Sequence, residues 1–98
     1  MLEIENGFFK ARMRVVKEFW SRDNKCQKYL ILVVLSPFEG VKKESIIDSL
    51  EKLGYKNILK FGNDIYVNIE TKNIKNQEIF LSDFCEMLAI FSQKVLAG

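Results

Sequence analysis

Histidine is absent from this 98-residue chain. Imidazole is the side chain that most readily exchanges protons near neutral pH, so its absence excludes histidine acid–base catalysis and histidine metal sites. Glycine is also scarce, and Gly7, Gly40, Gly54 and Gly62 each stand alone. Isolated glycines do not form the glycine-rich loop that holds phosphate groups. We therefore expect no enzymatic activity, no cofactor and no metal site.

Long apolar segments are missing as well. The longest uninterrupted run, Tyr29 to Leu35, has seven residues, whereas a helix that crosses a bilayer needs about 20. Glu3 and Glu5 stand where a secretory signal carries basic residues before an apolar stretch. These features predict a cytoplasmic protein without membrane association. The two cysteines, Cys26 and Cys85, have no paired spacing and are expected to be free thiols in that compartment.

Composition and charge describe one small domain. Hydrophobic residues make up 48% of the chain, which is enough for a single hydrophobic core. Fifteen basic residues nearly balance thirteen acidic ones, for a net charge of +2. A charge this small creates no general attraction to nucleic acid or anionic lipid, so any electrostatic specificity is local.

Apolar periodicity predicts the order strand, strand, helix, strand, strand, helix. Residues 9–15 alternate apolar and basic side chains, which gives a strand with one apolar and one cationic face. The run Tyr29 to Leu35 is apolar on both faces, as in the central strand of a sheet. A helix that begins near Lys42 and ends at Gly54 follows, with apolar residues at helical spacing.

The second half of the chain repeats this order. A hairpin turns around residues 62–64, with Ile65, Val67 and Ile69 facing inward on its second strand. Asn76 can cap the final helix. The predicted buried face of that helix carries Phe80, Phe84, Met87, Leu88, Phe91 and Val95.

These elements predict an α+β two-layer sandwich. Two helices on one face of a four-stranded antiparallel sheet would bury the apolar face of each layer. The ββαββα order suits a ferredoxin-like layout in circularly permuted form, with the N-terminal strand at the edge that a final strand fills in the usual order.

From Tyr29 onward the chain resembles PurS, the small dimeric subunit of phosphoribosylformylglycinamidine synthase. The resemblance lies in Ser49-Leu50-Glu51-Lys52-Leu53-Gly54-Tyr55, in the hairpin of residues 62–70 and in Phe84-Cys85-Glu86-Met87-Leu88-Ala89. The hairpin and final helix are also similar to the dimerising subunit of the KEOPS tRNA-modification complex. Both families consist of small non-catalytic proteins that pair with themselves and dock on larger enzymes. The resemblance therefore implies a self-associating accessory subunit.

A basic stripe is the first candidate for function. Lys10, Arg12 and Arg14 share one face of the first strand, and Lys17 extends the row. With an exposed Tyr66 they would bind phosphates while the ring stacks on a base, as in sheet proteins that bind single-stranded RNA. The alternative is that these charges only protect an open sheet edge from aggregation.

Apolar residues form the second and third candidates. Leu30, Leu32 and Val34 share the outer face of the central strand if the neighbouring residues face the helices. A second copy would cover this row, although the stems of long basic side chains would also do so. Phe19 and Trp20 lie at the hairpin tip, with Ile79 and Ile90 on the flank of the last helix. They either contact a partner or fold back on the core.

Together these features favour a small non-enzymatic interaction module. It would form a homodimer through its sheet and act as an accessory, regulatory or inhibitory subunit of a larger protein. The alternative is a single-stranded nucleic-acid binding protein that uses the basic N-terminal strand.

Overall fold

The computed structural model describes residues 2–23, 25–72, 74 and 76–97. Predictions that concern the side chains of Cys26 and Val95 fall outside the described part of the chain. The elements are β1 (Leu2–Glu5), β2 (Phe9–Trp20), β3 (Cys26–Pro37), α1 (Lys43–Lys52), β4 (Ile58–Phe61), β5 (Asp64–Thr71) and α2 (Gln77–Ala97).

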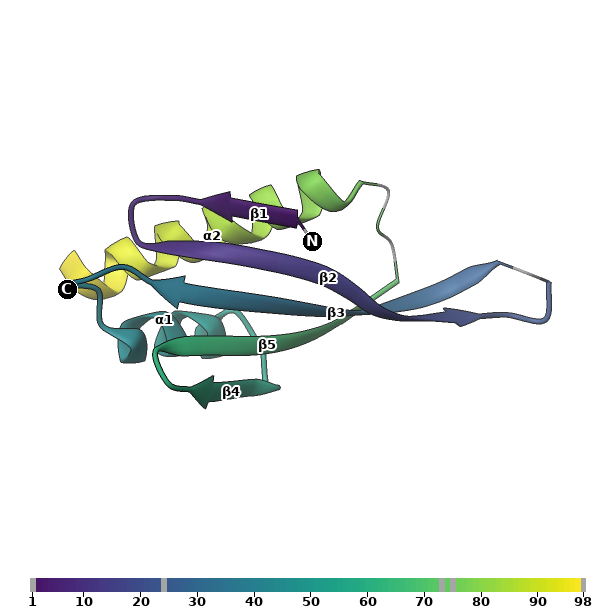
Figure 1. The fold of residues 1–98 in the computed structure, drawn as a ribbon, viewed down its shortest axis with the longest axis horizontal. Helices are drawn as coiled ribbons and strands as arrows, with labels where there is room; N and C mark the ends of the chain where they lie inside the picture. Colours follow the sequence, from purple (N-terminus) through teal and green to yellow (C-terminus); the bar gives the residue numbers. More distant parts are fainter. Residues whose placement is uncertain (1, 24, 73, 75, 98) are drawn as a thin grey trace.

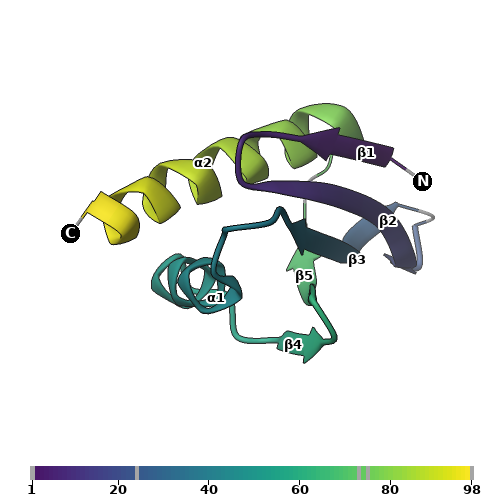
Figure 2. The same cartoon turned by 60° about the vertical axis from the view of Figure 1, so that its left-hand side comes forward.

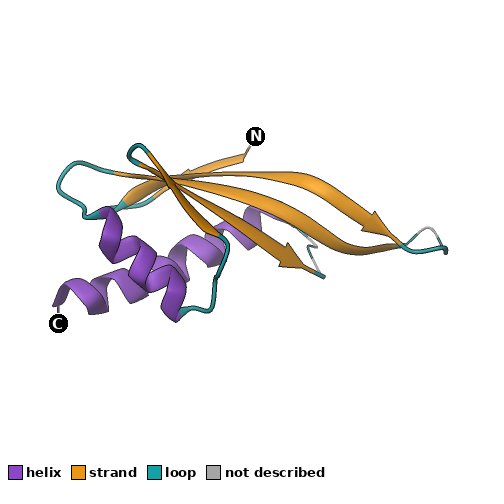
Figure 3. Cartoon of the chain, turned by 90° about the horizontal axis from the view of Figure 1, so that it is seen from below, coloured by secondary structure: helices purple, strands orange, loops and turns teal. Residues whose placement is uncertain are grey.

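The strands form one five-stranded sheet in the order β1-β2-β3-β5-β4, and every neighbouring pair is antiparallel. Both helices pack on the same face of this sheet (Figures 2 and 3), with α2 along β1 and β2 and α1 against β5. The α+β class and the central place of β3 are therefore confirmed. The four-stranded ferredoxin-like order is not matched, because a fifth strand, β1, lies outside β2.

The strand β1 was not predicted because its alternation covers only four residues, Leu2–Glu5. A tight turn holds it against β2. The side-chain Oδ1 of Asn6 accepts hydrogen bonds from the backbone N–H groups of Phe8 and Phe9, at 2.8 and 3.0 Å. An asparagine that bonds the backbone two and three residues later stabilises a turn in place of a longer loop. As a result, β2 is an interior strand and not the edge that the sequence predicted.

A β-bulge at Val16 changes which side chains of β2 face the helices. Val15 pairs with Ile31 and Lys17 pairs with Leu30, so Val16 is the extra residue. An extra residue reverses the alternation of a strand beyond it. Odd-numbered residues before the bulge point into the core, whereas Lys17 and Phe19 beyond it share a face with Leu30. No described residue of β2 beyond the bulge is buried.

Helix α1 ends in a Schellman motif, as the glycine in the sequence predicted. Gly54 has a φ of 96°, a left-handed conformation that glycine adopts without steric cost. The N–H of Gly54 bonds the carbonyl of Glu51, and the N–H of Tyr55 bonds the carbonyl of Leu50. These two bonds satisfy the last carbonyls of the helix and turn the chain toward β4.

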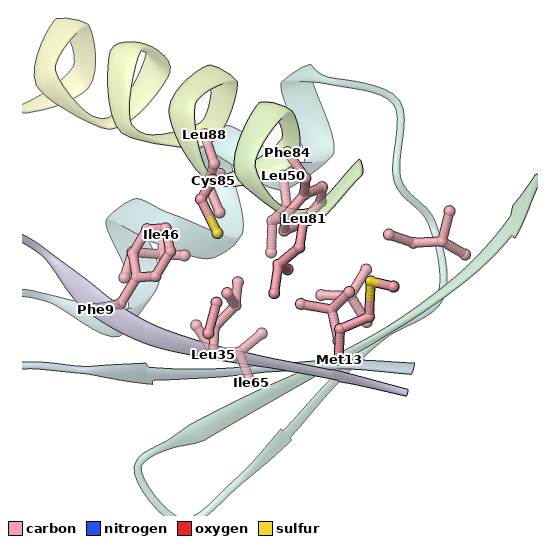
Figure 4. Packing of buried hydrophobic residues seen from close by; sticks show 14 of the residues in the cluster. Phe9, Met13, Leu35, Ile46, Leu50, Ile65, Leu81, Phe84, Cys85 and Leu88 are labelled. Carbon is pink, nitrogen blue, oxygen red and sulfur yellow. The ribbon is translucent and has the colours of Figure 1, made fainter. Parts of the chain in front are cut away.

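The core lies between the helices and the inner face of the sheet (Figure 4). Phe9, Met13, Leu35 and Ile65 point from the strands toward Ile46, Leu50, Leu81 and Leu88 on the helices, and all eight are almost fully buried. Phe84 is also buried, but Met87 is 51% exposed, so its predicted place on the buried face was wrong. Met87 lies three residues after Phe84, so its side chain is about 60° away from that of Phe84 around the helix axis.

Candidate functional site

The outer face of the sheet lies opposite the helices, and no other layer of the fold covers it (Figure 3). Since Ile31, Val33 and Leu35 are buried in the core, the alternate residues of β3 face outward. Their neighbours on β2, β5 and β4 follow from the strand registers. The outer face contains Lys10, Arg12, Arg14 and Lys17, then Leu30, Leu32 and Val34, then Tyr66, Asn68 and Glu70, and finally Leu59 and Phe61.

Val34 faces outward as predicted, yet it is only 8% exposed. It lies between its register partners Arg12 and Tyr66. The guanidinium of Arg12 extends past β3 to Asp64, 4.0 Å away. Its Nε is buried and has no hydrogen-bond partner among the described residues. Leu30 and Leu32 remain half-buried, so the accessible apolar row is shorter than the sequence predicted.

Two of the four cations in the basic stripe pair with carboxylates within the fold. Lys10 Nζ lies 3.0 Å from a carboxylate oxygen of Glu3, and Arg12 contacts Asp64. Arg14 is exposed and has no ion pair among the described residues. Phosphate groups would have to displace two carboxylates. The edge-protection interpretation is wrong for these residues. The strand β1 forms hydrogen bonds with β2 along the edge that would otherwise be open, so β2 is not an edge strand.

Two exposed apolar side chains on β4 extend the outer face and were not singled out from the sequence. Leu59 is 62% exposed and Phe61 is 72% exposed. The ring of Phe61 meets the ring of Tyr66 edge to face, with centroids 6.4 Å apart. The tight turn at Gly62 could have predicted this position of Leu59 from the sequence. The turn fixes the strand register, and that register puts Leu59 opposite Tyr66.

The hairpin end, which comprises residues 17–23 and 25–28, projects beyond the helices (Figure 1). The molecule is consequently 48 Å long and only 23 by 22 Å across. The ring of Phe19 lies between two ammonium groups, 4.9 Å from Lys17 Nζ and 5.0 Å from Lys28 Nζ. Trp20 is 59% exposed and does not fold back on the core. Phe19, Trp20, Lys28 and Lys72 line an open hollow of about 600 Å³.

Two titratable groups in the described chain, Cys85 and Tyr55, have a shifted pKa. Burial raises the pKa of the Cys85 thiol to about 11, so this sulfur is protonated and a poor nucleophile at neutral pH. Burial also raises the pKa of Tyr55. No three cysteine or carboxylate side chains among the described residues are placed to hold a metal ion. Neither helix, over its described residues, is long and apolar enough to span a membrane.

No protein-family model, curated protein or solved structure matches this chain. The resemblance to PurS and to the KEOPS subunit is therefore still an expectation from a few short segments.

Proposed function

We propose that this protein is a non-enzymatic interaction module. It forms a homodimer through the outer face of its sheet and serves as an accessory subunit of a larger cytoplasmic protein. The observation that carries the proposal is the arrangement of the outer face in three rows. Cations lie on β2, leucines on β3, and polar or acidic residues on β5.

The strand registers align these rows level by level. Arg14, Leu32 and Asn68 lie side by side across the three strands. One level further along, Lys17, Leu30 and Glu70 do the same. Each level therefore runs from a cation through a leucine to an acceptor of hydrogen bonds.

Such a surface is complementary to itself about one particular two-fold axis. An axis that runs along β3 places β2 of one copy over β5 of the other, at a sheet separation of about 10 Å. Lys17 would then face Glu70 of the second copy, and Leu32 would meet its own counterpart. An axis across the strands would instead set the two cationic rows against each other. The charges therefore favour the first arrangement.

The larger partner would contact the helices. In this dimer α2 faces away from the interface on both copies. It keeps three exposed apolar side chains, Ile79, Met87 and Ile90. Exposed apolar side chains that recur on one helix suit docking onto another protein.

Light scattering between about 1 and 100 µM tests self-association. We expect twice the chain mass of 11.5 kDa. Leu32→Asp should give the monomer mass, because it buries a charge at the axis. The matched control is Ile79→Asp, which introduces the same charge on the helix side and should leave the dimer intact.

Charge reversal tests the orientation of the two copies. Lys17→Glu and Glu70→Lys should each weaken the dimer, because like charges then face each other, and the double variant should restore it. Both positions are exposed, so these variants should keep the fold, while Glu70→Lys also removes the ion pair with Lys28 of the same chain. A monomer mass for the unmodified chain at every concentration would contradict self-association. Failure of the double variant to recover would contradict the axis along β3.

A further inference from the structure

We propose that the hairpin end binds single-stranded nucleic acid, with a base stacked on Trp20 and the adjacent phosphates held by Lys28 and Lys72. This inference does not rest on self-association, although the hollow adjoins the level of Lys17 and Glu70 on the outer face.

Accessibility is the first support for this site. No residue of β2 beyond the bulge at Val16 is buried, and the hairpin end projects past the helices (Figure 3). A long, flexible polymer can therefore pass along the hairpin end without meeting the helical layer. The indole of Trp20 is more than half exposed there, and a hydrophobic group of that size in water is a candidate for contact with another flat group.

The residues that line the hollow are two aromatic residues and two lysines. Phe19 and Trp20 supply the apolar part, and Lys28 and Lys72 supply the charge. Its volume of about 600 Å³ lies within the range of roughly 300 to 1,000 Å³ that small-molecule sites occupy. Single-strand binding proteins use this combination, because bases stack on aromatic rings and phosphates follow cations.

Charge near the hollow favours a polyanion. Four cations, Lys17, Arg22, Lys25 and Lys28, stand in residues 17–28 against the two carboxylates Glu18 and Asp23. The cations that line the hollow are lysines, which bind phosphate as point charges. An ammonium attracts any anion as a point charge, so the lysines alone do not separate a nucleotide chain from an acidic peptide. The exposed indole favours the nucleotide chain, because a base can stack on it.

Glu70 competes with phosphate for one of these lysines. Its carboxylate lies 3.3 Å from Lys28 Nζ, in a pair that is open to water on both sides. Exposed ion pairs of this kind contribute little to stability, so a phosphate can replace the carboxylate. Removing the charge of Glu70 should consequently strengthen the binding of nucleic acid. If the ion pair between Lys28 and Glu70 were purely structural, this change would not strengthen binding.

The fluorescence of Trp20 provides a direct measurement, because it is the only tryptophan in the chain. The probes are a 12-nucleotide oligo(dT), a 12-nucleotide oligo(U) and a 12-residue poly-glutamate, titrated at 50 mM salt. We expect both oligonucleotides to quench Trp20 and the peptide to leave it unchanged. Equal binding of the poly-glutamate would overturn the proposal in favour of an acidic protein partner. So would the absence of quenching by either oligonucleotide up to 100 µM.

Variants assign the binding to named side chains. Lys72→Gln should reduce the slope of log affinity against log salt by about 0.7, the value for one phosphate contact on a single strand. Lys60→Gln makes the same change in net charge on β4 and should leave the slope unchanged. Glu70→Gln should tighten binding. Equal effects of Lys72→Gln and Lys60→Gln would show general attraction without a site and would overturn the proposal.

The contribution of stacking is measured with labelled oligonucleotide, since Trp20→Ala removes the intrinsic probe. Fluorescence anisotropy should show affinity lower by about fivefold or more. An unchanged affinity would overturn the assignment to Trp20. Light scattering on the same samples reports self-association separately, so failure of one proposal does not hide the other.

Discussion

Ser92 on α2 donates a hydrogen bond to the side-chain oxygen of Ser49 on α1, 3.4 Å away, and both side chains are buried. Ser49 in turn donates to the backbone carbonyl of Ser45, at 2.9 Å. The two hydroxyls thus form a directed chain that ends on the helix backbone. Small side chains at this point let the two helices approach closely without leaving a buried polar group unpaired.

The donor-to-acceptor direction of these two hydrogen bonds predicts that substitution of the two serines lowers stability by unequal amounts. Ser49→Ala should destabilise the protein by about 1 to 3 kcal/mol, because the buried hydroxyl of Ser92 loses its acceptor. Ser92→Ala should cost less, since Ser49 still donates to the Ser45 carbonyl. Urea denaturation measures both variants. A larger cost for Ser92→Ala than for Ser49→Ala would contradict the direction assigned here.

Phe84 and Met87 provide a matched pair on the same helix. Phe84→Ala should cost about 3 to 5 kcal/mol, because Phe84 is buried and its ring meets that of Tyr55 edge to face, with centroids 5.4 Å apart. Met87→Ala should cost less than about 1 kcal/mol because the side chain is half in water. Similar midpoints for the two variants in the same urea series would show that the α2 face is assigned incorrectly.

The buried thiol of Cys85 should resist alkylation in the folded protein. In a Cys26→Ser background, iodoacetamide at pH 8 should modify Cys85 at least about a hundredfold more slowly than in denaturant. The raised pKa alone lowers the thiolate fraction by about that factor, and burial also limits access. Because the folded state favours the neutral thiol, its contribution to stability is present below the unfolded pKa and is lost as the pH rises toward 11. Rapid labelling without denaturant would contradict this burial.

The basic stripe should contribute little to nucleic-acid binding. Changing Lys10, Arg12 and Arg14 together to Gln should leave oligonucleotide affinity within about threefold at 150 mM salt, because Glu3 and Asp64 already neutralise two of them. Stability should change by less than about 1.5 kcal/mol, since the side chains of Lys10 and Arg12 are 44% and 39% exposed and ion pairs this open to water contribute little. Urea denaturation and fluorescence titration measure the two effects. A loss of affinity comparable with that of Trp20→Ala would move the nucleic-acid site to β2.

Periodicity predicted the parts of this fold whose pattern extends over several residues. The alternation from Phe9 to Val15 and the inward row Ile65, Val67 and Ile69 lie as predicted, because one buried face fixes the register of each strand. Asn76 caps α2 as predicted, and its Oδ1 accepts the N–H of Glu78 at 2.8 Å.

Features that depend on distant partners were not predicted. The strand β1 is too short to show a period, and it forms because a turn at Asn6 places it beside β2. Lys72 lines the hollow only because β5 ends beside the hairpin end, which no local pattern shows. Val34 is shielded because Arg12 extends from one neighbouring strand toward Asp64 at the start of the other.

The partial cover of β2 and β3 by the helices divides their backbone hydrogen bonds into two classes of hydrogen exchange. Amides paired around Met13 and Val33 lie over the core, so they exchange only when the whole domain unfolds. The residues of β2 beyond Val16 are not buried, so their amides should exchange through local fraying of the hairpin. A substitution among these residues should therefore leave the global free energy of unfolding almost constant.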